Sequence, residues 1–140
     1  MQAFVLLGVL LFSDLTRPQA TFWYASLLAE SGYGRLPRER AAFLIREADG
    51  TLTVEIWAHG SRRHATFRGA VPFGTIAILH THPHGDERPS AQDRDEAARL
   101  RLPVVVITTG GVVAAMPDGT DVVLTSSLLP SSRGEGAEGG

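Results

Sequence analysis

The chain has 140 residues, of which 44% are hydrophobic and 20% charged, so it fits one globular domain with a substantial core. Its net charge of -2, mixed in sign along the chain, provides no basic field for nucleic acid. The absence of cysteine excludes disulfides, thiolate metal sites and cysteine nucleophiles. Nucleic acid is therefore not an expected partner.

The first twenty residues differ from the rest, because Ala3 to Phe12 are ten apolar residues in succession. This run is too short for a stable membrane span but has the length of a signal-peptide core, and Ala20 would then precede the cut. The alternative is a buried first strand or helix of the domain, and both interpretations stay open. We treat residues 1–20 as a separate apolar segment and expect the domain proper over residues 21–129.

A helix and then a β-hairpin are predicted next. Pro18 suits a first helical turn, apolar residues recur four apart after it, and Gly32 suits the position just past a helix end. The helix is therefore expected over Pro18–Ser31. Strands are expected at Ala41–Arg46 and Thr51–Ala58, with a tight turn at Asp49–Gly50 and a weaker strand at Arg63–Phe67.

The second half alternates short apolar runs with one helical segment. Thr75–His82 is apolar on both faces for most of its length, which predicts a central strand. A helix over Ser90–Leu102 follows, and residues 130–140 form a small, polar, disordered tail. Short strands are expected at Val104–Thr108, Val112–Met116 and Val122–Thr125. The fold class is a mixed α/β domain with one sheet and two main helices.

Two histidines and a carboxylate form the most distinctive cluster. His80 and His82 lie two apart on the expected central strand, so their side chains leave the same face. Ser90 and Asp93 lie three apart in the first turn of the next helix, hence on one side of it. Two imidazoles and one carboxylate leave a fourth zinc position open for water, as catalytic sites require. Taken singly, Ser90 and Asp93 could be only a helix cap, and the histidines only core or surface residues.

Together these residues form the pattern H-x-H-P-x6-S-x-x-D, which runs from His80 to Asp93. The pattern resembles the signature of the JAMM/JAB (MPN-plus) metalloprotease family, which includes deubiquitinating isopeptidases and compact bacterial and archaeal members. The resemblance implies a JAB/MPN-like domain with a central mixed sheet flanked by helices. It also implies that His80, His82 and Asp93 hold one Zn²⁺ per chain, and that Ser90 stabilises the oxyanion of the tetrahedral intermediate.

The same family uses an upstream glutamate as general base, commonly in a segment like P-x-E-x-x-G-L-L. Pro37 to Leu44 (PRERAAFL) matches this segment, with Ala42 in place of the glycine. The resemblance therefore places the base at Glu39. Three other glutamates fit the role less well, because Glu55 lies on the polar face of a strand, Glu47 adjoins a turn and Glu30 lies near a helix end.

By this resemblance, the leading hypothesis is a zinc-dependent peptidase or isopeptidase that processes or deconjugates ubiquitin-like proteins, in the cytoplasm. A second hypothesis is an exported metallopeptidase acting on cell-envelope peptides, which the apolar N-terminal segment favours. A third is a catalytically inactive scaffold of the MPN-minus kind. Such members typically lose metal ligands, whereas all three ligand residues stand in this sequence.

Overall fold

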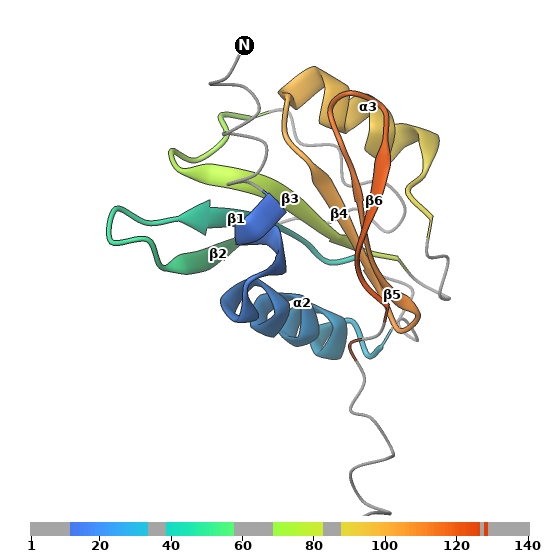
Figure 1. The fold of residues 1–140 in the computed structure, drawn as a ribbon, viewed down its shortest axis with the longest axis horizontal. Coiled ribbons are helices and arrows are strands. Elements are labelled where there is room, and N and C mark those ends of the chain that lie inside the picture. Colours follow the sequence, from blue (N-terminus) through green and yellow to red (C-terminus); the bar gives the residue numbers. More distant parts are fainter. Residues whose placement is uncertain (1–11, 34–38, 58–68, 83–87, 127, 129–140) are drawn as a thin grey trace, which may run out of the picture.

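A computed structural model describes residues 12–33, 39–57, 69–82, 88–126 and 128 (Figure 1). Residues 12–16 form a short helical turn ahead of the first long helix. The elements that follow are α2 (Pro18–Glu30), β1 (Ala41–Arg46), β2 (Leu52–Ile56), β3 (Thr75–Thr81), α3 (Ala91–Leu100), β4 (Val104–Thr108), β5 (Gly111–Ala115) and β6 (Asp121–Thr125).

The strands form one six-stranded sheet in the order β2-β1-β3-β4-β5-β6. β3 and β4 run parallel, and the other neighbouring pairs are antiparallel. A parallel pair needs a crossover connection, and α3 supplies it between β3 and β4 (Figure 1). Because β1 runs opposite to β3, the start of β1 and the end of β3 meet at one end of the sheet. The chain leaves β3 at that same end and enters α3.

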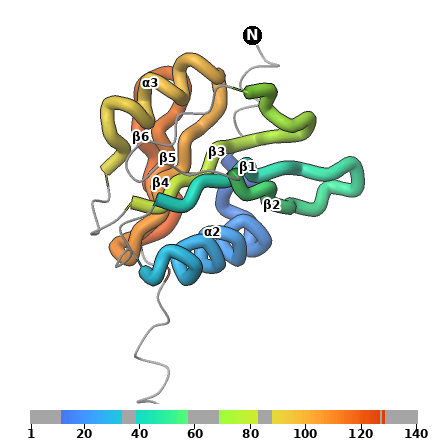
Figure 2. Tube along the Cα trace, turned by 180° about the vertical axis from the view of Figure 1, so that it is seen from behind, coloured from blue at the N-terminus to red at the C-terminus, as the bar shows by residue number. Residues whose placement is uncertain are grey.

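Each face of the sheet is covered by one of the helices (Figure 2). On the α2 face, Tyr24, Leu27 and Leu28 join a core cluster with alternate residues of β3, Ala77 and Leu79. On the α3 face, the second cluster contains Phe43, Ile78, Ala97, Val104 and Ala115. β3 is therefore covered on both sides, which agrees with its expected central position and its continuous apolar sequence.

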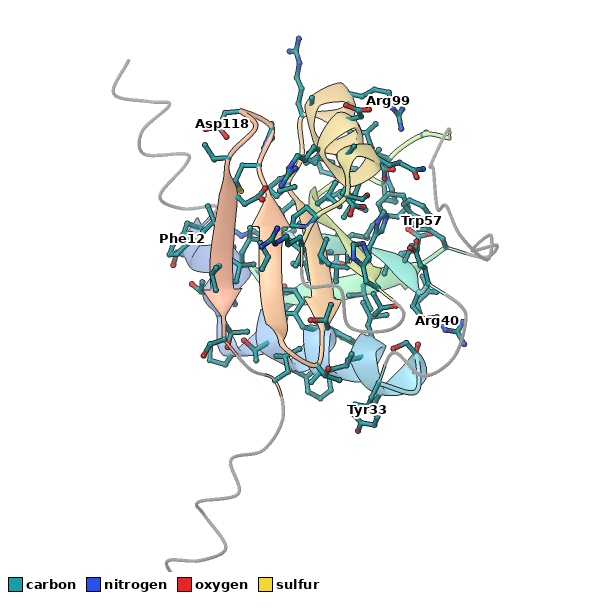
Figure 3. The ribbon with its side chains drawn as sticks, turned by 90° about the vertical axis from the view of Figure 1, so that its right-hand side faces the viewer. Phe12, Tyr33, Arg40, Trp57, Arg99 and Asp118 are labelled. Carbon is teal, nitrogen blue, oxygen red and sulfur yellow. The ribbon has the colours of Figure 1, made fainter. Side chains whose placement is uncertain are left out.

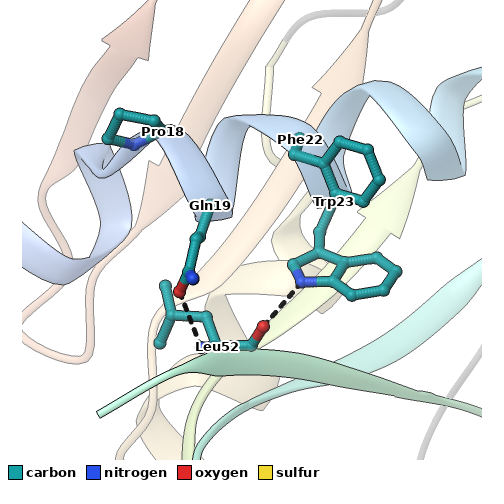
Figure 4. A pocket seen from close by; sticks show the side chains of 5 residues that line it. All are labelled: Pro18, Gln19, Phe22, Trp23 and Leu52. Atoms are coloured by element: carbon teal, nitrogen blue, oxygen red, sulfur yellow. Dashed lines mark hydrogen bonds between the residues drawn. The ribbon is translucent and has the colours of Figure 1, made fainter.

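Side chains of α2 also bind the backbone of β2 (Figure 4). Trp23 Nε1 donates a hydrogen bond to the Leu52 carbonyl at 2.8 Å, and Gln19 Oε1 accepts one from the Leu52 amide at 2.9 Å. With Pro18 and Phe22, these residues line an apolar hollow of about 410 Å³. Because β2 is the outermost strand on its side, these bonds satisfy backbone groups that have no strand beside them.

The segment before residue 21 takes part in the core. Leu15 and Ala20 are fully buried, and the hydroxyl of Tyr24 donates a hydrogen bond to the Leu15 carbonyl at 2.8 Å. α2 runs without a break across the boundary expected after residue 20. Residues 1–11 lie outside the described residues, so the signal-peptide hypothesis stays a prediction.

The expected α/β class, with a central mixed sheet between helices, is confirmed. The predicted bounds of the elements agree with the structure to within about two residues. The difference at β5 has a clear physical cause. This strand begins at Gly111 rather than at Val112, and Gly111 has a φ of 143°. A Cβ there would lie 2.7 Å from the Thr125 carbonyl oxygen of β6, so the close pairing requires glycine. The weaker strand expected at Arg63–Phe67 and the tail at 130–140 lie outside the described residues.

The Tyr24 hydroxyl offers a test of this packing. Tyr24→Phe removes a buried hydrogen bond, so the free energy of unfolding is expected to fall by about 1–2 kcal/mol in urea denaturation. Tyr33→Phe is the matched control, because the Tyr33 side chain is 50% exposed, and it is expected to change stability by less than about 0.5 kcal/mol. Equal stability of Tyr24→Phe and the wild-type protein would contradict this account.

Candidate functional site

The two histidines of the motif lie at the carboxyl end of β3. Ile78 belongs to the core cluster on the α3 face, and alternation along the strand places His80 and His82 on that same face. Both are buried, with 3% and 8% of their surfaces exposed. The strand thus presents two imidazoles toward the helix that covers it.

The first turn of α3 brings Ser90 and Asp93 to the same place. Ser90 is the N-cap residue, and its Oγ accepts a hydrogen bond from the Asp93 amide at 3.1 Å. In return, Asp93 Oδ2 accepts a hydrogen bond from the Ser90 amide at 2.8 Å, which completes a capping box. The interpretation of these two residues as a helix cap is therefore correct, but it does not exhaust the role of Asp93.

The Asp93 carboxylate lies between the two imidazoles. Its Oδ1 is 3.0 Å from His80 Nδ1, and its Oδ2 is 3.0 Å from His82 Nε2. Burial acts to raise the pKa of Asp93, but the hydrogen bonds to His80 and His82 outweigh burial and hold that pKa well below its ordinary value. The structure thus brings together the three residues predicted as metal ligands, with the carboxylate ionised.

Glu39 enters the site from the start of β1. The Arg40 amide donates to Thr81 Oγ1 at 2.8 Å, and the Arg40 carbonyl accepts from the Thr81 amide at 2.9 Å. One residue further along this antiparallel pairing, Glu39 stands level with His82, and residues opposite one another share a face. Its half-buried side chain is also close enough for its charge to affect the pKa of Glu96 on α3. The other glutamates considered, Glu30, Glu47 and Glu55, are exposed.

Glu96 is a site residue that the sequence analysis missed. It lies three residues after Asp93 on α3, is 3% exposed, and neither of its carboxylate oxygens has a hydrogen-bond partner among the described residues. Its Oε1 is 3.8 Å from His80 Nε2, which also has no hydrogen-bond partner there. Burial raises the pKa of Glu96, although the charges of His80 and Arg99 oppose the shift. The i, i+3 spacing from Asp93 was the available signal, but the sequence DRDE looks like an exposed, charged helix face.

An aromatic wall closes the site beside His80. The Trp57 and His80 rings meet edge to face with centroids 5.6 Å apart, and Trp57 packs in turn on Phe43 at 5.4 Å. Figure 3 shows Trp57 beside α3. These ring contacts limit the directions in which the His80 ring can turn.

The chemistry of this donor set suits a divalent transition metal. Imidazole and carboxylate are zinc ligands, and ligand atoms each about 2.0–2.2 Å from one tetrahedral ion lie about 3–3.5 Å apart, close to the spacing seen between Asp93 and each histidine. Among the described residues, however, no three or more His, Cys, Asp and Glu side chains form a ready-made metal cage. In this structure the Asp93 carboxylate contacts the two histidines directly, so metal binding is a proposal.

Comparison with known proteins agrees with this geometry. Residues 24–123, well over half of the chain, match the model of the prokaryotic homologs of the JAB domain. The chain belongs to this prokaryotic JAB family. It is also similar to a protein of Thermus thermophilus named "Probable TtuB-protein conjugate cleaving protease", at 46% identity over 50 residues. That match covers 35% of this chain and 33% of the relative, so the chain spans about a third of the relative's length. No solved structure gives a significant match.

The matched range of this JAB domain contains all residues of the cluster around Asp93, from Glu39 to Glu96. The apolar hollow beside Leu52 lies against α2, on the opposite face of the sheet from His80, and no acid or base lines it. Within the described residues, the helices are too short or too polar to cross a membrane. The cluster around Asp93 is therefore the candidate functional site.

The cap at Ser90 can be tested separately from any chemistry. Ser90→Ala removes the side-chain bond to the Asp93 amide, so the free energy of unfolding is expected to fall by about 0.5–2 kcal/mol, whereas Ser90→Gly is expected to cost only a few tenths, roughly 0.3 kcal/mol. Thermal and urea unfolding of the two variants measure the difference. Equal losses in both would show that the cap does not stabilise α3.

Proposed function

We propose that this JAB domain is a zinc-dependent metallopeptidase or isopeptidase that hydrolyses amide bonds and processes or deconjugates ubiquitin-like proteins. The observation that carries the proposal is the buried Asp93 carboxylate, held 3.0 Å from a ring nitrogen of both His80 and His82. An ionised carboxylate and two imidazoles in one buried place are costly to assemble for stability alone. Their presence supports a site built for an ion and a reaction.

His80, His82 and Asp93 would hold the zinc ion, leaving one position open. When bound, zinc supplies Lewis-acid polarisation of the substrate carbonyl and a water whose pKa is lowered to about 7. Proton transfer and stabilisation of the oxyanion are assigned to the side chains around the ligands. The inactive-scaffold hypothesis is not favoured, because no ligand residue is missing from the sequence or from the cluster.

Glu39 is the proposed general base. In this proposal it takes a proton from the attacking water and delivers it to the departing amine nitrogen. Its half-buried side chain is close enough for its charge to affect the pKa of Glu96, which supports a place for it beside the cluster. The other glutamates considered have no such position, which favours Glu39 as the base.

Ser90 is the proposed donor to the developing oxyanion. Its Oγ accepts the hydrogen bond from the Asp93 amide, so its own hydroxyl proton remains available for donation. Ser90 is exposed at the N-terminus of α3, where backbone amides and the helix dipole also favour negative charge. Capping the helix and donating to the oxyanion are therefore compatible roles for one hydroxyl.

The substrate class is proposed from the similarity to the conjugate-cleaving relative. Because the matched segment is short, the proposal names a class of substrate and not one particular protein. A ubiquitin-like protein ends in an extended tail, and the acyl carbon at its last residue is the carbonyl that an isopeptidase attacks. Cell-envelope peptides are the alternative class, and the substrate test below includes them.

The role of Glu39 predicts a specific kinetic result. Glu39→Gln is expected to lower kcat about 10²–10⁴-fold, because it removes the proton acceptor and keeps the shape. Zinc affinity, measured by competition with a chromophoric chelator, is expected to stay unchanged, because Glu39 is not a ligand. Glu55→Gln is the matched control on the exposed side of β2 and is expected to retain full activity. Normal turnover by Glu39→Gln would remove it from the mechanism.

The metal and substrate are tested together. A ubiquitin-like domain ending in Gly-Gly is joined to a carrier by a peptide bond in one substrate and by a lysine isopeptide bond in another. Cleavage of these substrates is expected to be abolished by metal removal and restored by stoichiometric zinc. Undiminished cleavage by the metal-free protein would refute zinc dependence. Cleavage of cell-envelope peptides, with both conjugates left intact, would instead favour the alternative substrate class.

A further inference from the structure

We propose that Glu96 is a positioning residue of this site, which accepts a hydrogen bond from His80 Nε2 and so directs His80 Nδ1 toward Asp93 and the metal. The inference rests on the proposed zinc site but concerns a residue outside the ligand set. Two observations carry it: the carboxylate of Glu96 and Nε2 of His80 are both buried without hydrogen-bond partners among the described residues, and they lie 3.8 Å apart.

Buried polar atoms without partners are costly, so their placement side by side requires an explanation. The cost is the lost hydration of each group, and it is larger for a charged group. A hydrogen bond from an imidazole nitrogen to an oxygen spans about 2.7–3.2 Å. The pair at 3.8 Å is therefore less than about 1 Å from a bond that would satisfy both groups.

Metal binding through Nδ1 of His80 would fix the ring proton on Nε2, where Glu96 can accept a hydrogen bond from it. An imidazole that binds a metal through one nitrogen carries its proton on the other, and that N–H needs an acceptor. Nδ1 of His80 faces Asp93 at 3.0 Å, so Nε2 is the nitrogen left to carry the proton. Glu96 Oε1 is the carboxylate oxygen on that side of the ring. Carboxylate–histidine–zinc arrangements of this kind fix both the tautomer and the orientation of the ring.

The position of Glu96 argues against its being a fourth ligand. Asp93 and Glu96 face the two different nitrogens of the same imidazole, so an ion bound on the Nδ1 side lies across the ring from Glu96. The Trp57 ring packs on the His80 ring with an interplanar angle of 88°, and this contact restricts the His80 ring from turning to bring both carboxylates to one ion. Glu96 thus acts through His80 and not on the substrate.

Two variants of Glu96 and one control test the proposal in the full-length protein. Glu96→Leu removes the acceptor, Glu96→Gln keeps a neutral acceptor, and Asp95→Asn removes a charge from the exposed neighbouring position on α3. Zinc affinity, measured by chelator competition, is expected to fall about 10–100-fold in Glu96→Leu and by less than about 10-fold in Glu96→Gln. Asp95→Asn is expected to match the wild-type protein.

Two further measurements separate positioning from a structural role. The metal-free Glu96→Leu protein is expected to unfold at the same temperature as the wild-type protein or higher, because the substitution removes a buried carboxylate without partners. In the zinc-loaded wild-type protein, ¹⁵N-edited NMR of the histidine rings is expected to show the proton of His80 on Nε2. The cobalt-substituted spectrum is expected to keep the same coordination number in every variant.

The outcomes distinguish this inference from the proposed function. If the wild-type protein takes up no zinc, both fail. If it binds zinc and Glu96→Leu binds equally well, the positioning role fails and the proposed function stands. A proton on His80 Nδ1 in the zinc-loaded protein, a changed cobalt coordination number in Glu96→Leu, or a loss of metal-free stability that matches the loss of affinity would each overturn the positioning role.

Discussion

The contact of the Asp93 carboxylate with the two imidazoles is the interaction on which the candidate site depends. A buried carboxylate is tolerated only where hydrogen bonds compensate the lost hydration, and Asp93 receives them from His80, His82 and the Ser90 amide. One side chain thereby joins the end of β3 to the start of α3. The same carboxylate completes the helix cap, so local helix formation and assembly of the site are parts of one hydrogen-bond network.

The topology explains why these groups meet. The parallel pair of β3 and β4 forces the chain to leave at the carboxyl end of β3 and cross over through α3, so the helix begins near the strand end that carries the histidines. β1 pairs antiparallel to β3, so its first residues lie at that same end and bring Glu39 level with His82. Ala42, which stands where the resembled segment has glycine, is fully buried between neighbouring strands, and the small side chain preserves this packing. Crossover and strand direction together bring Asp93, Glu39 and the two histidines to one end of the sheet from three separate elements.

Short-range patterns predicted most of this arrangement. The two-residue spacing of His80 and His82 and the three-residue spacing of Ser90 and Asp93 each define a shared face, and β3 and α3 bring those faces together. Glu39 required the family pattern, because nothing local shows that the start of β1 pairs with the end of β3. The three-residue spacing from Asp93 was the available signal for Glu96, but spacing does not show burial, because burial of a charged residue depends on what covers it. The packing of α3 on the sheet buries one side of the DRDE turn, and a single sequence does not show which side that is.

The two carboxylates of α3 face different nitrogens of the His80 ring, Asp93 facing Nδ1 and Glu96 facing Nε2. This arrangement suggests why a glutamate stands at position 96. For stability alone, an apolar side chain at position 96 would join the neighbouring Ala97 and Leu100 in the core cluster and avoid the cost of a buried acid. A residue that opposes stability in this way indicates a requirement of the site, since active sites are where local rules of folding are broken. The requirement we infer is an acceptor for the proton that a metal-bound His80 must carry. On this argument, the imidazole is held from both sides by carboxylates one helical turn apart, and α3 sets the orientation of a ligand that belongs to β3.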